Sequence, residues 1–240
     1  MSETFQIRLA RVQERMAAAC RRAGRVPESV RLIAVSKTHG PDAVAAVAAC
    51  GQPVFGENKV QEARAKIPLA PSGLLWHLIG HLQSNKAAQA VELFDVIHSV
   101  DSLKLLNVLN RAGDEQGRTV RVLLEVNVSG ESSKFGLKPE EVPAVLAAAN
   151  ALPRVEVQGL MTMAPLAPEA EKARPYFRRL RERRDQWSAQ LGTPLPELSM
   201  GMSMDFEVAI EEGATWVRVG SAIFGEREKP PRPQADEGGL

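Results

Sequence analysis

The sequence predicts an α/β protein, a single-domain (β/α)8 barrel, because strand and helix patterns alternate along nearly the whole chain. Segments rich in Val, Ile and Leu begin near Val30, Pro53, Trp76, Val96, Val120, Val155, Glu197 and Trp216. Helical patterns lie between them, at residues 42–50, 59–67, 84–92, 102–116, 139–151, 169–191 and 205–212. Eight strand and helix units of this kind are what closes a (β/α)8, or TIM, barrel.

The character of the strands supports this interpretation over a doubly wound sheet. Residues 122–128 read Val-Leu-Leu-Glu-Val-Asn-Val, apolar on nearly both faces, as expected for parallel strands covered by helices. A doubly wound sheet would have about five to seven strands and a G-x-G-x-x-G turn after the first. Residues 36–40 read Ser-Lys-Thr-His-Gly and carry no such turn, so the barrel is favoured.

Both ends of the chain lie outside the alternation. Near the start, apolar residues fall on one helical stripe: Phe5, Leu9, Val12, Met16 and Ala19. This predicts an extra N-terminal helix packed on the outside of the barrel, capped by Ser2 or Thr4. Residues 226–233 are polar and proline-rich and cannot build a core. We therefore expect one domain, residues 1–228, and a disordered polar tail, residues 229–240.

Composition excludes several classes of function. The 240 residues are 44% hydrophobic and 25% charged, with a net charge of +1, so no overall field attracts nucleic acid or an anionic membrane. The N-terminus lacks the pattern of a signal peptide, and no stretch approaches the roughly 20 apolar residues of a membrane span. Cys20 and Cys50 are unclustered, which favours reduced thiols. We expect a cytoplasmic protein.

Lys37 is the first candidate functional residue. It follows the apolar run 30–36, so the first strand delivers an amine to its C-terminal end, where barrel active sites lie. Burial beside apolar strands favours the neutral amine, which attacks aldehydes, whereas a solvated lysine stays protonated. The alternative is an ordinary solvated lysine at a strand end.

Other residues follow the strands at the same end of the barrel: Glu57, Asn58, His77, His81, Met161, Thr162, Ser203, Arg218, Gly220 and Ser221. The loops after strands seven and eight commonly hold phosphate in this fold. Gly220 permits close backbone approach, and Ser221 begins a turn whose N–H groups attract an anion. Ser203 adds a hydroxyl, or instead caps the helix that begins near Asp205. A lysine together with a phosphate cradle suggests pyridoxal 5'-phosphate (PLP).

Six ordered motifs strengthen this interpretation. They lie at residues 35–38, 55–62, 76–86, 159–163, 199–205 and 217–221 and span roughly residues 9–225. On these motifs the chain resembles the pyridoxal phosphate homeostasis protein family, single-barrel relatives of the alanine racemase N-terminal domain, which is the fold type III of PLP-binding proteins.

The resemblance implies a role for each candidate. Lys37 would hold PLP covalently as a Schiff base, and Ser203 with the amides of Gly220 and Ser221 would hold the phosphate. Arg218 would face the pyridine nitrogen. The family often has threonine where this chain has Ser221, a change that keeps both the hydroxyl and the amide.

Flanking residues are more ambiguous. By the resemblance, Asn58 and Met161 would lie beside the cofactor ring, but Asn58 is also placed to cap the helix that starts at Lys59. His77 and His81 fit hydrogen-bonded packing residues better than cofactor ligands.

The same residues favour a carrier over an enzyme. An arginine opposite the pyridine nitrogen weakens the ring as an electron sink. Racemisation needs a second base. By the resemblance to alanine racemase, that base is a tyrosine supplied by a partner's extra domain, whereas the single tyrosine here, Tyr176, falls in a predicted helix rather than at a strand end. We therefore expect a non-catalytic protein of vitamin B6 homeostasis that binds PLP and delivers it to apo-enzymes.

Two enzymatic alternatives stay open. A weak PLP-dependent amino-acid racemase would need an acid or base such as His81 or Lys134, the latter being otherwise part of a polar loop. An aldolase-type barrel would use Lys37 on a sugar phosphate without a cofactor.

Two further expectations concern partners. The basic run 178–185 accompanies an apolar stripe, so we interpret it as the solvated face of a barrel helix rather than a nucleic-acid site. The absence of the racemase second domain favours a monomer.

Overall fold

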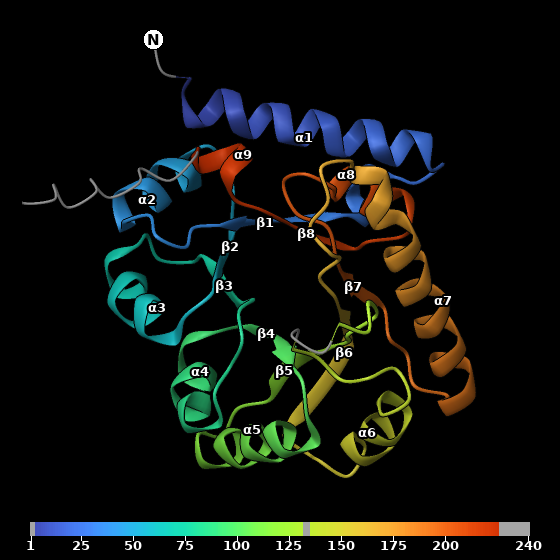
Figure 1. Ribbon diagram of the computed structural model, residues 1–240. Coiled ribbons are helices and arrows are strands. Elements are labelled where there is room, and N and C mark those ends of the chain that lie inside the picture. The colour runs from blue at the N-terminus through green and yellow to red at the C-terminus, as the bar shows by residue number, and fades with distance from the viewer. Residues whose placement is uncertain (1–2, 132–134, 226–240) are drawn as a thin grey trace, which may run out of the picture.

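The computed structural model describes residues 3–131 and 135–225 and confirms the predicted barrel. Eight parallel strands pair in sequence order, and the last pairs with the first, which closes the sheet (Figure 1). The strands are β1 (Arg31–Val35), β2 (Val54–Glu57), β3 (Leu75–Leu78), β4 (Val96–Val100), β5 (Val120–Glu125), β6 (Val155–Met161), β7 (Glu197–Ser199) and β8 (Trp216–Val219). The predicted boundary at residue 228, the tail 229–240 and Lys134 lie outside the described residues.

Helices surround the strands, as predicted. They are α1 (Phe5–Arg22), α2 (Pro41–Ala49), α3 (Val60–Lys66), α4 (Ala87–Leu93), α5 (Leu103–Glu115), α6 (Val142–Ala149), α7 (Arg174–Leu191), α8 (Phe206–Glu211) and α9 (Ser221–Phe224). Short 3-10 turns are η1 (Pro27–Ser29), η2 (Ile67–Leu69), η3 (Ser84–Lys86) and η4 (Ala170–Ala173).

Local chemistry explains where the helices depart from the predicted ranges. The predicted helices 84–92 and 169–191 both open with a 3-10 turn, a common start for a helix. The helix predicted at 139–151 begins only at Val142, with Pro143 in its first turn, where the missing N–H of proline costs nothing.

Helix α1 packs on the outside of the barrel, against α2, α8 and α9 (Figure 1). The Thr4 hydroxyl accepts a bond from the Ile7 amide at 3.4 Å, so Thr4 is the cap. The predicted stripe is buried from Leu9 to Ala19, while Phe5 is half-buried, with its ring 6.0 Å from that of Phe224. The helix therefore joins the first and last parts of the barrel.

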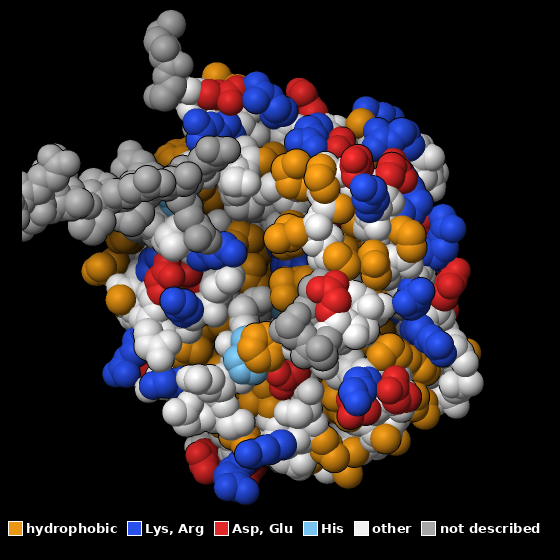
Figure 2. Space-filling view, viewed as in Figure 1, with side chains coloured by type: hydrophobic (Ala, Val, Ile, Leu, Met, Phe, Trp, Pro, Cys, Tyr) orange, Lys and Arg blue, Asp and Glu red, His pale blue; other side chains and the backbone are white. Residues whose placement is uncertain are grey.

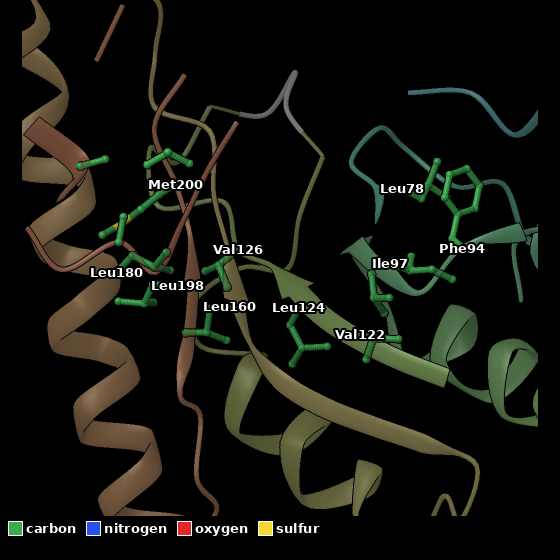
Figure 3. Close-up of a cluster of buried hydrophobic side chains, with 14 of the residues drawn as sticks. Leu78, Phe94, Ile97, Val122, Leu124, Val126, Leu160, Leu180, Leu198 and Met200 are labelled. Carbon is green, nitrogen blue, oxygen red and sulfur yellow. The ribbon is translucent and has the colours of Figure 1, made fainter. Parts of the chain in front are cut away.

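Two apolar layers fill the molecule. The larger lies between strands and helices, and Figure 3 shows part of it, where Leu160 and Leu198 of the sheet lie near Leu180 of α7. Alternate strand positions face the barrel interior, where two small clusters form. One contains Ile33, Val35, Val54, Ile79 and Trp216; the other contains Val96, Leu123 and Met161.

Strands β7 and β8 are aligned over a short stretch. Their only aligned pair in the described chain is Ser199 with Trp216. Backbone bonds continue beyond it, since the Arg218 amide donates to the Gly201 carbonyl at 3.0 Å. Gly201 has φ +91°, and an added Cβ would lie 2.5 Å from that of Ala209, so glycine is required there. The turn at Gly201 leads from β7 into the loop that carries Ser203.

Two further properties match the composition. Across residues 3–131 and 135–225, every helix is too short or too polar to cross a membrane. Cys20 is a buried free thiol of α1, and Cys50, at the end of α2, is a half-buried one.

Candidate functional site

A cavity of about 350 Å³ opens at the C-terminal edge of the barrel, a size typical of small-molecule sites. Six predicted cofactor residues line it: Lys37, Asn58, Ser203, Arg218, Gly220 and Ser221. Its rim includes the exposed apolar side chains of Met163, Leu166 and Met204. In Figure 2, hydrophobic side chains gather around the hollow near the centre of the face. The cavity therefore joins an amine, a cation and a hydroxyl within an apolar rim.

A buried ion-pair cluster holds the start of the loop that carries Lys37. The Lys66 ammonium donates to the Ser36 carbonyl at 2.8 Å, to Glu57 Oε1 at 2.6 Å and to Glu62 Oε1 at 2.9 Å. The Ser36 hydroxyl donates to the same Glu57 oxygen at 2.7 Å. Lys66 is 5% exposed and Glu57 is fully buried, so the cluster is shielded from water. Ser36 is thus fixed through both its carbonyl and its side chain.

The residue after Lys37 is held as well. Thr38 has φ 69°, a left-handed conformation that is costly for a β-branched residue. Its amide donates to Glu62 Oε1 at 2.5 Å, and that carboxylate also belongs to the ion-pair cluster. Both neighbours of Lys37 are therefore anchored to the Lys66 cluster, while Lys37 itself, half-buried, lines the cavity.

Ser203, Gly220 and Ser221 form one edge of the cavity. The Gly220 amide donates to Ser203 Oγ at 3.2 Å, which leaves the serine hydroxyl proton to be donated elsewhere. Helix α9 begins at Ser221, and the first N–H groups of a helix have no acceptor within it. The chemistry of this donor set suits an anion.

The alternative role of Ser203, as a helix cap, is wrong. Helix α8 begins at Phe206, and Asp205 occupies the cap position. The Asp205 carboxylate instead accepts a bond from the Met202 amide at 2.6 Å, and burial raises its pKa. Ser203 is therefore available to the cavity.

Arg218 is the buried cation of the site. Its Nη1 donates to Ser199 Oγ at 2.7 Å and its Nη2 to the Thr162 carbonyl at 3.0 Å. Burial lowers its pKa to about 10, against the opposing effects of Asp205 and Glu125. The guanidinium therefore keeps its charge at neutral pH.

Ser199 connects Arg218 to two buried histidines. Its hydroxyl lies 2.9 Å from His98 Nδ1, and His98 Nε2 lies 2.9 Å from His77 Nδ1. Burial lowers the pKa of His77 to about 3 and lowers that of His98 strongly, so both imidazoles are neutral. Neither histidine lines the cavity. His77 is thus a hydrogen-bonded packing residue, in line with the sequence interpretation.

His81 also lies away from the cavity wall. Its Nδ1 is 3.2 Å from Asp101 Oδ2, and its ring stacks on that of Phe135 with 3.9 Å between centroids. These contacts account for its position at the mouth without any contact with a bound molecule.

The two predicted flanking residues have different positions. Asn58 lines the cavity, and it does not cap α3, because Lys59 occupies the cap position. Met161 is fully buried in the interior cluster with Val96 and Leu123 and is not part of the cavity wall. Its predicted role beside a cofactor ring stays a prediction.

Known proteins are similar to this chain in sequence and fold. Residues 7–228 match the family model described as the alanine racemase N-terminal domain. Among curated relatives, the pyridoxal phosphate homeostasis protein of Aquifex aeolicus is 45% identical over 222 residues, covering 92% of this chain and 97% of its own. That of Escherichia coli K12 is 42% identical over 229 residues, covering 92% and 95%.

A solved structure adds a ligand to the comparison. PipY of Synechococcus elongatus PCC7942, solved with PLP bound, is 43% identical, with a TM-score of 0.78, and the alignment covers 89% of this chain and 100% of PipY. The chain belongs to the pyridoxal phosphate homeostasis protein family. Membership of this family agrees with the closed eight-stranded barrel that the sequence predicts.

Sequence reasoning missed several residues that shape the site. Three of them support cavity residues or their neighbours through buried hydrogen bonds: Lys66, Ser199 and His98. A fourth, His39, lines the cavity, and its ring stacks on that of Phe224 with 4.8 Å between centroids. Only His98 left a clear signal, as a polar residue inside the apolar run of β4. The partners of Lys66 and Ser199 depend on contacts between elements, which no local pattern contains.

Proposed function

We propose that the chain binds PLP through a Schiff base on Lys37 and serves intracellular vitamin B6 homeostasis as a carrier. The observation that carries the proposal is that Lys37, Arg218 and the Ser203 edge line one cavity. When bound, PLP supplies an aldehyde that condenses with a primary amine. Lys37 is the lysine of the described chain that lines the cavity.

The polar groups of the cavity also fit the phosphate and the pyridine nitrogen of PLP. Ser203 donates its hydroxyl, and the amides at the start of α9 offer further donors to a phosphate. Arg218 would present a fixed charge to the pyridine nitrogen. Asn58 contributes a polar side chain to the wall. PipY, which is 43% identical, was solved with PLP bound, and this supports PLP as the ligand.

A carrier role follows from what the residues can do with protons. The guanidinium of Arg218 disfavours protonation of a pyridine nitrogen, and this weakens any stabilisation of a carbanion. Tyr176, the single tyrosine of the sequence, lies in α7 and does not line the cavity. We propose a non-catalytic protein that holds PLP and delivers it to apo-enzymes, thereby affecting amino-acid metabolism.

Weak amino-acid racemisation is the second candidate, and one observation favours it. His39 lines the same cavity as Lys37, so two groups able to move a proton face it. Incubation of the PLP-loaded protein with L-alanine in D₂O tests this. Formation of D-alanine with deuterium at its α-carbon, lost in His39→Ala, would establish the racemase, and its absence supports the carrier.

We propose that the protein acts as a monomer in the cytoplasm, without nucleic-acid or membrane partners. Its two free thiols suit a reducing compartment. The basic run of α7 supports the absence of a nucleic-acid site, because Arg174, Arg178 and Arg181 all pair with Glu212. Light scattering of the purified chain measures its mass directly.

The decisive experiment is reduction of the PLP-loaded protein with borohydride, followed by peptide mass mapping. We expect a visible Schiff-base absorption band and one phosphopyridoxyl adduct, on Lys37, both lost in Lys37→Ala. Lys59→Ala is the matched control, since Lys59 is exposed and does not line the cavity. An adduct scattered over surface lysines, or retained in Lys37→Ala, would overturn the assignment.

A further inference from the structure

The interior of the barrel contains a continuous polar chain where apolar side chains are usual. Residues from four strands join in it: Arg218 of β8, Ser199 of β7, His98 of β4 and His77 of β3. Barrel interiors are normally filled by Val, Ile and Leu, as in the two apolar clusters on the same face. Burying a polar group costs free energy unless it is hydrogen-bonded, so the presence of four linked polar residues in this interior calls for an explanation.

One placement of the protons satisfies every hydrogen bond of this polar chain, the Ser199 hydroxyl proton included. A guanidinium only donates, so Ser199 Oγ accepts from Arg218 and its own proton goes to His98 Nδ1. His98 then carries its proton on Nε2 and donates it to His77 Nδ1. Every bond points away from Arg218, and each imidazole accepts at Nδ1 and keeps its proton at Nε2.

We propose that Ser199, His98 and His77 are positioning residues that hold the Arg218 guanidinium toward the cavity. This inference rests on the proposed function, because the charge they place is the one assigned to the pyridine nitrogen. Arg218 touches the cavity, whereas the other three lie behind it. Two of its nitrogens are already committed, to Ser199 and to the Thr162 carbonyl, so its orientation is fixed before any ligand arrives.

The protein contains a matched pair of buried serines on which the proposal can be tested. Ser199 and Ser99 are both 0% exposed and lie on barrel strands. Ser199 bonds Arg218 and His98, whereas the Ser99 hydroxyl has no hydrogen-bond partner among the described residues. Ser199→Ala and Ser99→Ala therefore remove the same atom from the same degree of burial, and differ in whether that atom supports Arg218.

The first measurement needs no cofactor. In the ¹⁵N NMR spectrum of the PLP-free protein, we expect His77 and His98 as neutral Nε2–H tautomers and a slowly exchanging Arg218 side-chain signal. Ser199→Ala should broaden or remove the Arg218 signal, and Ser99→Ala should leave it in place. A His98 that carries its proton on Nδ1, or an Arg218 signal unchanged in Ser199→Ala, would overturn the inference.

The second measurement is PLP affinity by spectral titration. Loss of a hydrogen bond to a charged group predicts roughly 10-fold weaker binding by Ser199→Ala, with a shifted absorption maximum. Ser99→Ala should bind as the wild type does, and Ser199→Thr should restore binding because it keeps the hydroxyl. Equal affinities in the two alanine variants would contradict the inference. The proposed function would still stand in that case, because it depends on the Lys37 adduct. Failure of the wild type to form that adduct would remove the proposed function instead.

Discussion

The two halves of the barrel are held together in different ways. In what we call the ladder half, β3 to β6, backbone pairing dominates: β5 and β6 align from Val120–Val155 to Glu125–Met161. In the site half, β7, β8, β1 and β2, the strands β7 and β8 align at one pair of residues in the described chain. Buried side-chain bonds add to the backbone bonds there, such as Arg218 to Ser199.

This difference shows how the fold makes room for a ligand. Where two strands pair along their length, their amides and carbonyls bond to each other, whereas backbone groups beyond the strand ends are left to side chains and ligands. Side chains such as Arg218 and Ser203 then satisfy some of these groups and leave the remainder facing the cavity. Stability and binding should therefore respond together in the site half and separately in the ladder half, apart from His77 and His98, which support Arg218 through Ser199.

The largest effect should come from Lys66→Met in the site half. It leaves Glu57 fully buried without its cation, which should lower the free energy of unfolding by about 3–5 kcal/mol. PLP binding by the folded fraction should weaken as well, because Ser36 and Glu62 lose the partner that holds the Lys37 loop. Urea unfolding and spectral titration measure the two effects.

Lys104→Met is the control, because Lys104 is exposed on α5. It should change stability by less than about 0.5 kcal/mol. If Lys66→Met destabilised the protein as little as the control does, the ion-pair cluster would not be what supports the site half.

Gly113→Ala tests the ladder half. A Cβ at Gly113, on α5, would lie 2.8 Å from the carbonyl oxygen of Arg118 and 2.9 Å from Cγ2 of Val120, so α5 and the start of β5 would have to separate. We expect a loss of roughly 3 kcal/mol in the free energy of unfolding, with the PLP affinity of the folded protein unchanged.

The comparison variant is Gly40→Ala, where φ is −74° and an added Cβ meets nothing within 4 Å. It occupies a helix cap position, so a cost within about 1 kcal/mol is expected. A parallel fall in PLP affinity with Gly113→Ala would contradict the separation of the two halves.

A pH-dependent effect belongs to Glu125, at the end of β5. Burial, together with the charge of Asp101, raises its pKa from 4.5 to about 7, against the opposing effect of Arg218. The folded protein binds this proton more tightly than the unfolded chain, so stability is fully present below pH 4.5 and falls as the pH rises toward 7. Beyond that pH the loss should level off at about 3 kcal/mol.

Glu125→Gln isolates this contribution because glutamine stays neutral. The difference in unfolding free energy between this variant and the wild type, measured at pH 5 and pH 8, should grow in favour of the variant at pH 8. Subtraction removes the opposite trend of His77 and His98, whose lowered pKa values destabilise the fold in acid. A pH-independent difference would show that Glu125 is ionised throughout.

Local sequence patterns predicted the barrel well because its strands and helices are locally encoded. Every strand begins within one residue of its predicted start, since runs of Val, Ile and Leu mark buried parallel strands. The cavity residues Lys37, Ser203 and Arg218 could be predicted because they end strands, and strand ends meet at one edge of a barrel.

The supporting contacts could not be predicted in this way. Lys66 looks like an exposed residue of an amphipathic helix, yet it is buried against β1 and β2. Ser199 gains its role only when β4 and β8 lie on either side of it within the closed barrel. Such partners are set by three-dimensional packing, which a one-dimensional pattern does not record.

The closure of the barrel between β1 and β8 has a consequence for synthesis on the ribosome. Lys37 emerges early, whereas Arg218 and the Ser221 turn emerge late, so a nascent chain cannot assemble the cavity for most of its translation. Contacts between distant parts of a chain form slowly, and this one also requires α1 to dock on α8 and α9. The cavity proposed to bind PLP is therefore completed only by the last strand, so a growing chain cannot offer the whole site to a ligand before it has folded.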